Sequence, residues 1–134
     1  MSNSKKNGWV GVDLDGTLAV YDGWQGIEHI GAPIPATVRR VKSLLRAGVE
    51  VRIFTARVQE GEAAIRAIES WCLKHLGVVL PITDKKDFGM VYALDDRAVT
   101  VEFNTGRPLV LVPPLTTIRR HWKVGAPNPE EFRH

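Results

Sequence analysis

The chain has 134 residues, 44% hydrophobic and 25% charged, which suits a single globular domain spanning 1–134. No apolar stretch approaches the roughly 18 residues of a membrane span, and no apolar segment follows the basic N-terminus as in a secretory signal. Much of the net charge of +3 falls after Arg107, which suits a solvated basic end better than a nucleic-acid surface. With a lone cysteine, Cys72, the chain is expected to be cytoplasmic. Residues 1–7 and 123–134 are expected to be flexible tails.

The first predicted element is a buried strand over residues 8–14. Its valine-rich run ends in Asp13 and Asp15, which Gly16 and Thr17 follow. Residues two apart in an extended chain point the same way, so both carboxylates can face one site beyond the strand. Gly16 permits a sharp turn that leaves backbone amides uncovered for an anionic ligand. The plain alternative is a strand that ends in an ordinary Asp-Gly turn.

Helices and strands alternate along the rest of the chain. The glycine-rich stretch over 19–33 is expected to be an irregular loop or a short hairpin. Pro35 and Gly48 bound a first helix and Gly77 ends a second, which begins near Glu60. The remaining strands are expected over 49–54, 78–82, 90–95 and either 99–101 or 109–112, and a short amphipathic helix over 115–122. This alternation predicts a three-layer α/β fold with a parallel sheet.

Polar signatures follow three of the later strands. They are Thr55-Ala56-Arg57 after the second strand, Lys85-Lys86 after the third, and Asp95-Asp96 after the fourth. Together with Asp13 to Thr17 they resemble, in order and over residues 9–97, the four motifs of the haloacid dehalogenase-like (HAD) superfamily of phosphohydrolases. The resemblance implies a Rossmann-like sheet with the first strand at its centre. Neither usual insertion position can hold a separate domain, so the chain resembles a capless member.

The resemblance also implies a reaction, the hydrolysis of a phosphate monoester through an aspartyl-phosphate on Asp13. In that reaction Asp15 would protonate the leaving group and later activate water, and Thr55 would bind a phosphoryl oxygen. A lysine would neutralise the nucleophile and the phosphate. Lys86 is preferred to Lys85 because it directly precedes an acidic residue, as the family's lysine often precedes a proline or an acid.

A magnesium site is the cofactor that the resemblance implies. Its ligands would be Asp13, Asp95, Asp96 and the backbone carbonyl of Asp15, since Mg²⁺ prefers oxygen ligands in octahedral geometry. No cluster of cysteine and histidine argues for zinc. Taken alone, Asp95-Asp96 could also be a plain turn.

Substrate binding is assigned more loosely. The candidates are the backbone amides at Gly16 and Thr17, the side chains of Arg57 and Lys85, and four residues of the 19–33 loop, Tyr21, Trp24, Glu28 and His29. Structural alternatives are a surface position for Arg57, a helix cap for Thr55 and simple packing for Trp24. An open site suits a polynucleotide end, a phosphoprotein, or a small phosphate enclosed by an oligomeric neighbour. The rival hypothesis is a metal-binding module that acts through a protein or nucleic-acid partner with little turnover.

Overall fold

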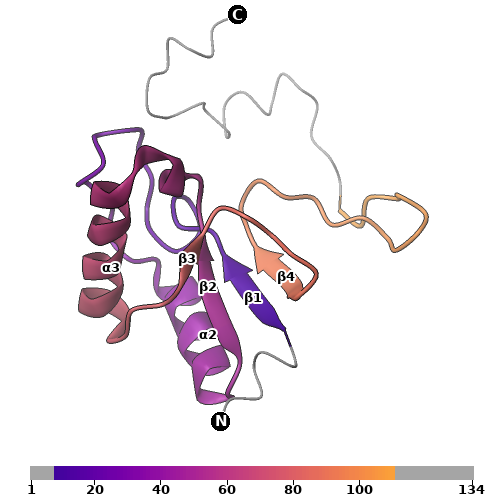
Figure 1. Ribbon diagram of the computed structural model, residues 1–134. Helices are drawn as coiled ribbons and strands as arrows, with labels where there is room; N and C mark the ends of the chain where they lie inside the picture. Colours follow the sequence, from indigo (N-terminus) through magenta and orange to yellow (C-terminus); the bar gives the residue numbers. More distant parts are fainter. Residues whose placement is uncertain (1–7, 111–134) are drawn as a thin grey trace, which may run out of the picture. The chain divides into compact units, whose positions relative to one another are not determined.

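The computed structural model describes residues 8–110 (Figure 1). The chain divides into two compact units, Met1–Asp96 and Arg97–His134. The first unit contains all the helices and named strands of the described residues. They are β1 (Trp9–Val12), α2 (Pro35–Arg46), β2 (Glu50–Phe54), the 3₁₀ helix η1 (Ala56–Glu60), α3 (Glu62–Leu76), β3 (Ile82–Thr83) and β4 (Met90–Leu94).

The four strands form one parallel sheet in the order β3-β2-β1-β4. The first strand therefore lies inside the sheet, flanked by β2 and β4, as expected. Its last residue, Val12, is in register with Ile53 of β2 and Leu94 of β4. Because the three strands are parallel, the residues that follow them emerge along one edge of the sheet.

Local signals in the sequence set the helix ends. Pro35 occupies the first turn of α2, where its missing N–H costs no hydrogen bond. Helix α3 ends at Gly77, which has a left-handed φ of 80° and donates its N–H to the Leu73 carbonyl. Both ends were predicted within a residue or two. The second helix starts slightly later than predicted because residues 56–60 form η1 instead.

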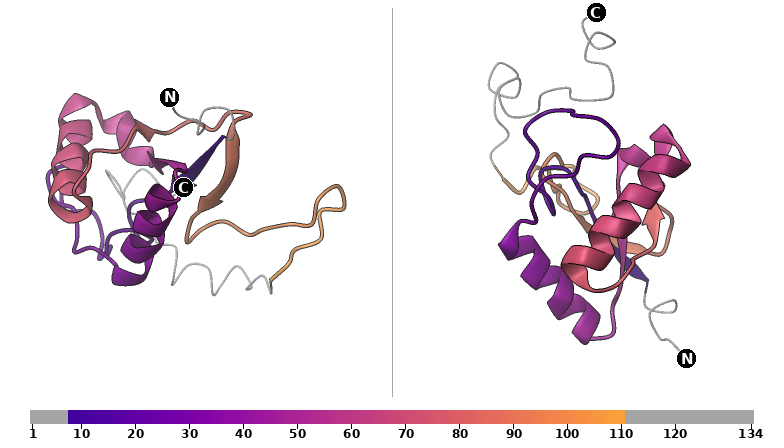
Figure 2. Two further views of the ribbon diagram at one scale, coloured as in Figure 1. Left: turned by 90° about the horizontal axis from the view of Figure 1, so that it is seen from below. Right: turned by 90° about the vertical axis from the view of Figure 1, so that its left-hand side faces the viewer.

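The core lies between the sheet and the two helices. Val41 of α2 and Ile68 and Cys72 of α3 are fully buried and belong to one cluster with Val12 and Ile53 of the strands. Alternate residues of a strand face opposite sides, so both helices cover the same side of the sheet (Figure 2). The described residues therefore show two layers of the predicted three. None of their helices is long and apolar enough to cross a membrane.

The opposite side of the sheet carries an aromatic and polar cluster. The Arg52 guanidinium stacks 4.4 Å above the Trp9 ring, and Phe54 meets this ring edge-on. The Trp9 indole N–H donates to Asp87 over 2.9 Å, and the Gly89 amide donates to the same carboxylate. These two bonds lower the pKa of Asp87. The Trp9 bond also attaches the connection between β3 and β4 to strand β1.

Two predicted strands differ in the structure. The strand expected over 78–82 is only Ile82–Thr83, because Pro81 has no N–H and contributes only its carbonyl, which accepts from Ile53. In the second unit, residues 99–101 form no strand. Val101 makes an isolated antiparallel bridge with Pro108, and the Leu109 amide donates to the Thr100 carbonyl. The two segments that compete in sequence for a fifth strand therefore pair with each other, while residues 111–112 and the helix expected over 115–122 lie outside the described residues.

Candidate active site

Three aspartates meet where β1 and β4 end. Asp13 directly follows β1, and its amide donates to the carbonyl of Leu94, the last residue of β4. This bond brings Asp13 alongside Asp95 and Asp96. One carboxylate oxygen from each of the three lies within 4.8 Å of the others, and all three residues are half-buried. The parallel neighbours thus turn two distant sequence motifs into one acidic cluster.

The cluster strongly perturbs Asp13. Its pKa is raised to about 8, first because burial disfavours the charged carboxylate. A hydrogen bond with the Asp96 side chain and the negative charges of Asp95 and Asp96 add to this effect, and the Leu14 amide opposes it. Asp13 therefore holds a proton at neutral pH unless a positive charge takes the proton's place.

Gly16 and Thr17 shape the position of Asp96. The Thr17 hydroxyl donates to the Asp96 carboxylate over 2.9 Å and accepts from the Asp96 amide over 3.0 Å. Gly16 has φ of 91°, and a Cβ there would lie 2.7 Å from an Asp96 oxygen, so the position requires glycine. The backbone amides of Gly16 and Thr17 donate to the carbonyls of Ala19 and Leu14, respectively. The expectation that these amides are uncovered for a ligand is therefore wrong.

Asp15 is paired with Arg57 rather than with the other aspartates. The guanidinium Nε and Nη2 atoms donate to the two carboxylate oxygens over 2.8 and 2.9 Å. Arg57 is only 5% exposed, so it is not the surface arginine of the alternative interpretation. Sequence reasoning placed Arg57 near the phosphate but missed this pairing. The available signal was an arginine three residues beyond the end of the second predicted strand, at the same edge of the sheet as Asp15.

Thr55 is buried at the start of η1, where its hydroxyl oxygen accepts a hydrogen bond from the Arg57 amide over 3.1 Å. This is the capping role offered above as its structural alternative. The hydroxyl proton is not used in that bond and stays available as a donor. Capping is therefore compatible with a contact to a phosphoryl oxygen.

The 19–33 loop reaches the site through Arg57. The guanidinium also donates to the backbone carbonyls of Ile27 and His29, and the Trp24 ring lies 4.9 Å from it. The His29 contact uses the backbone, and its side chain is exposed. The ring therefore packs the loop onto a residue that itself holds Asp15, which agrees with the packing alternative for Trp24, and a contact of Trp24 with substrate stays a prediction.

Neither candidate lysine contacts the aspartate cluster among the described residues. Lys85 is exposed and pairs with its neighbour Asp84 over 3.2 Å. Lys86 is also exposed and forms no hydrogen bond or ion pair with the described part of the chain. Their assignment to the site stays a prediction.

Comparison with known proteins bears on the fold alone. No protein-family model matches the chain, and no curated protein matches it either. A solved structure of a conserved protein from Bacteroides thetaiotaomicron is 25% identical, covering 69% of this chain and 78% of that one, with a TM-score of 0.51. This likeness supports the fold. Residues 8–110 form a small α/β fold of Rossmann-like type, with a four-stranded parallel sheet and two α-helices.

The donor set of the aspartate cluster fits a hard divalent cation. Three carboxylate oxygens within 4.8 Å of one another can bind a single ion, and oxygen ligands are those that Mg²⁺ and Ca²⁺ prefer. No histidine or cysteine joins the cluster among residues 8–110, so its chemistry does not favour zinc. A cation here would also replace the proton that Asp13 otherwise holds.

The raised pKa predicts how the metal-free protein responds to pH. Between the unfolded value of 3.8 and the folded value of about 8, folded Asp13 holds a proton that the unfolded chain has released. The folded state therefore loses stability as pH rises. The free energy of unfolding is highest below pH 3.8 and falls between pH 3.8 and about 8, by up to about 1.4 kcal/mol per pH unit. Urea denaturation in chelator between pH 5 and 8 measures this slope. The same series on Asp13→Asn is the control, and an equal slope in both proteins would contradict the assignment.

Proposed function

We propose that this protein is a capless, HAD-like, Mg²⁺-dependent phosphatase that hydrolyses a phosphate monoester through an aspartyl-phosphate on Asp13. The proposal is carried by one observation above all. Asp13 lies at the end of an internal strand with one carboxylate oxygen within 4.8 Å of oxygens from Asp95 and Asp96. A second carboxylate follows two residues later, at Asp15. The motif order along the chain, which resembles that of the HAD superfamily, supports the same reaction.

In the first step, an Asp13 oxygen attacks phosphorus in line with the ester oxygen that leaves. The bond to that oxygen breaks as the new bond to Asp13 forms, and Asp15 supplies the proton that the leaving oxygen needs. In the second step, Asp15 accepts a proton from water, whose oxygen attacks phosphorus and releases Asp13 and inorganic phosphate. A bound Mg²⁺ would supply positive charge beside the phosphoryl oxygens.

The structure shows Asp15 in an ion pair with Arg57, with both of its oxygens accepting hydrogen bonds from the guanidinium. To act as the acid, Asp15 therefore has to turn away from Arg57 and take up a proton before it meets the leaving oxygen. The Thr55 hydroxyl, buried beside Arg57, can donate its free proton to a phosphoryl oxygen. We assign neutralisation of the phosphate to Lys86, with Lys85 as the alternative, as the sequence motif suggests.

Turnover of a panel of phosphate monoesters, with Mg²⁺ or with excess chelator, tests the proposal. We expect hydrolysis of at least one ester with Mg²⁺ and none with chelator. Asp13→Asn should lose this turnover, and its matched control is Asp22→Asn, which removes one negative charge from an exposed aspartate of the 19–33 loop and should retain it. No turnover of any ester by the folded wild-type protein with Mg²⁺ would contradict the proposal.

Mg²⁺ should also stabilise the fold. A ligand that binds only the folded state stabilises it by about 2.7 kcal/mol at 100 times its dissociation constant. We expect the thermal midpoint to rise with Mg²⁺ in the wild-type protein and to stay constant in Asp96→Ala, which lacks one ligand. Differential scanning fluorimetry in millimolar Mg²⁺ and in chelator measures this shift. An equal rise in Asp96→Ala and the wild type would place the ion elsewhere.

A further inference from the structure

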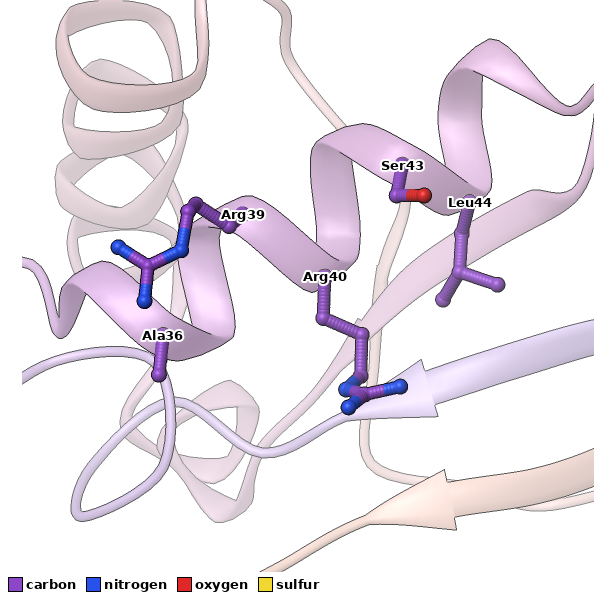
Figure 3. Close-up of a pocket in the computed structure, with 5 residues that line it drawn as sticks. All are labelled: Ala36, Arg39, Arg40, Ser43 and Leu44. Carbon is purple, nitrogen blue, oxygen red and sulfur yellow. The ribbon is translucent and has the colours of Figure 1, made fainter.

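A groove leads from the aspartate cluster to helix α2. Near the cluster it is lined by Gly16, Thr17, Asp95 and Asp96, and on the helix side by Ala36 and Arg40. A second groove along α2 is lined by Ala36, Arg39, Arg40, Ser43 and Leu44 (Figure 3). Ala36 and Arg40 line both grooves, so the two adjoin at these residues. Arg40 therefore lies on the path from the cluster along the helix.

The charge on this helix is all of one sign. Residues Pro35–Arg46 include the four basic side chains of Arg39, Arg40, Lys42 and Arg46, and no acidic one. All four residues are exposed, and none forms an ion pair with any part of the chain between residues 8 and 110. Of these four, Arg39 and Arg40 line the grooves. Ala36 and Arg40 are four residues apart on one helix face, about 6 Å along the axis.

We propose that this groove binds a second phosphate group of the substrate, so that the preferred substrate is a phosphate monoester bearing a further phosphate or phosphodiester. The inference rests on the proposed function, in which the reacting phosphate lies at Asp13. A guanidinium presents several N–H donors in a fixed planar array that matches phosphate oxygens. Arg40 binds the second group and Arg39 extends the positive groove beyond it. The groove thus defines substrate class, where the aspartate cluster defines the reaction.

The experiment compares propyl phosphate with propane-1,3-diol bisphosphate, which differ by one phosphate. A short oligothymidylate with a terminal phosphate distinguishes a small bisphosphate from a polynucleotide end as the source. In Arg40→Gln, we expect the ratio of kcat/KM for the bisphosphate or oligonucleotide to that for propyl phosphate to fall by about tenfold to a hundredfold. The substrate whose ratio falls further identifies the source. The matched control is Arg46→Gln, which removes the same charge from the same helix outside both grooves, and which should preserve the ratio.

Equal ratios in Arg40→Gln and wild type would overturn the inference. An equal fall of the ratio in Arg46→Gln would also overturn it, because it would show that the positive charge of the whole helix, and not a site at Arg40, attracts the substrate. Calorimetric binding of propyl phosphate and propane-1,3-diol bisphosphate distinguishes a failure of this inference from a failure of the proposed function. If no ester is hydrolysed, the phosphatase proposal fails. The groove is then still tested, because Arg40→Gln must weaken bisphosphate binding more than propyl phosphate binding, and equal weakening refutes it.

Discussion

Asp13→Asn is expected to abolish hydrolysis of phosphate monoesters while leaving the protein folded. The neutral amide cannot attack phosphorus, and loss of a nucleophile typically removes all but a minor residue of turnover, here to below about 0.1% of wild-type kcat. Steady-state assays with Mg²⁺ on the best ester of the panel measure this loss. The fold should survive because asparagine has nearly the shape of the protonated aspartate that the metal-free protein already holds.

The stability of the variant separates chemistry from folding. At pH 8 the metal-free Asp13→Asn protein should be at least as stable as wild type, because it carries no negative charge beside Asp95 and Asp96. Circular dichroism during urea denaturation provides this control. Activity above a few per cent of wild type, in a preparation free of the parent protein, would exclude Asp13 as the nucleophile.

Arg57→Ala is expected to give the largest loss of stability among single changes at the site. Arg57 is 5% exposed and donates to both Asp15 oxygens and to two loop carbonyls. Removing Arg57 leaves the Asp15 carboxylate, which is 21% exposed, without its partner, and the expected cost is about 3 kcal/mol, the lower end of the range for fully buried pairs. The Trp24 ring also loses the cation that it packs against. The free energy of unfolding from urea titration measures the change.

The matched control for this prediction is Arg66→Ala. Arg66 pairs with Glu62 across one turn of α3, but its side chain is 67% exposed, so the expected loss is below about 0.5 kcal/mol. Arg57→Lys should restore only part of the stability, since an ammonium cannot form the paired contacts of a guanidinium. Equal losses in Arg57→Ala and Arg66→Ala would show that the buried pairing contributes little.

The parts of this protein that sequence alone determined are local ones. Pro35 and Gly77 mark helix ends through the missing N–H of proline and the left-handed backbone of glycine, and these constraints act wherever the helix lies. The valine-rich apolar run before Asp13 likewise identifies a buried strand from local sequence alone. Parallel strands present their carboxyl ends along one edge, so Asp13 and Asp95 were expected at the same edge of the sheet, and the expectation that they meet there came from the resemblance to the HAD superfamily.

Tertiary structure decided which side chains became partners. Arg57 and Asp15 are 42 residues apart, and Thr17 and Asp96 are 79 apart, so no periodicity or local propensity connects them. Their pairing depends on the order β3-β2-β1-β4, which places the ends of β2 and β4 on either side of β1. Strand order also puts both helices on one side of the sheet, giving two described layers where alternation alone predicted three. Strand order depends on the burial and hydrogen bonding of the whole unit, which no single segment of the sequence determines.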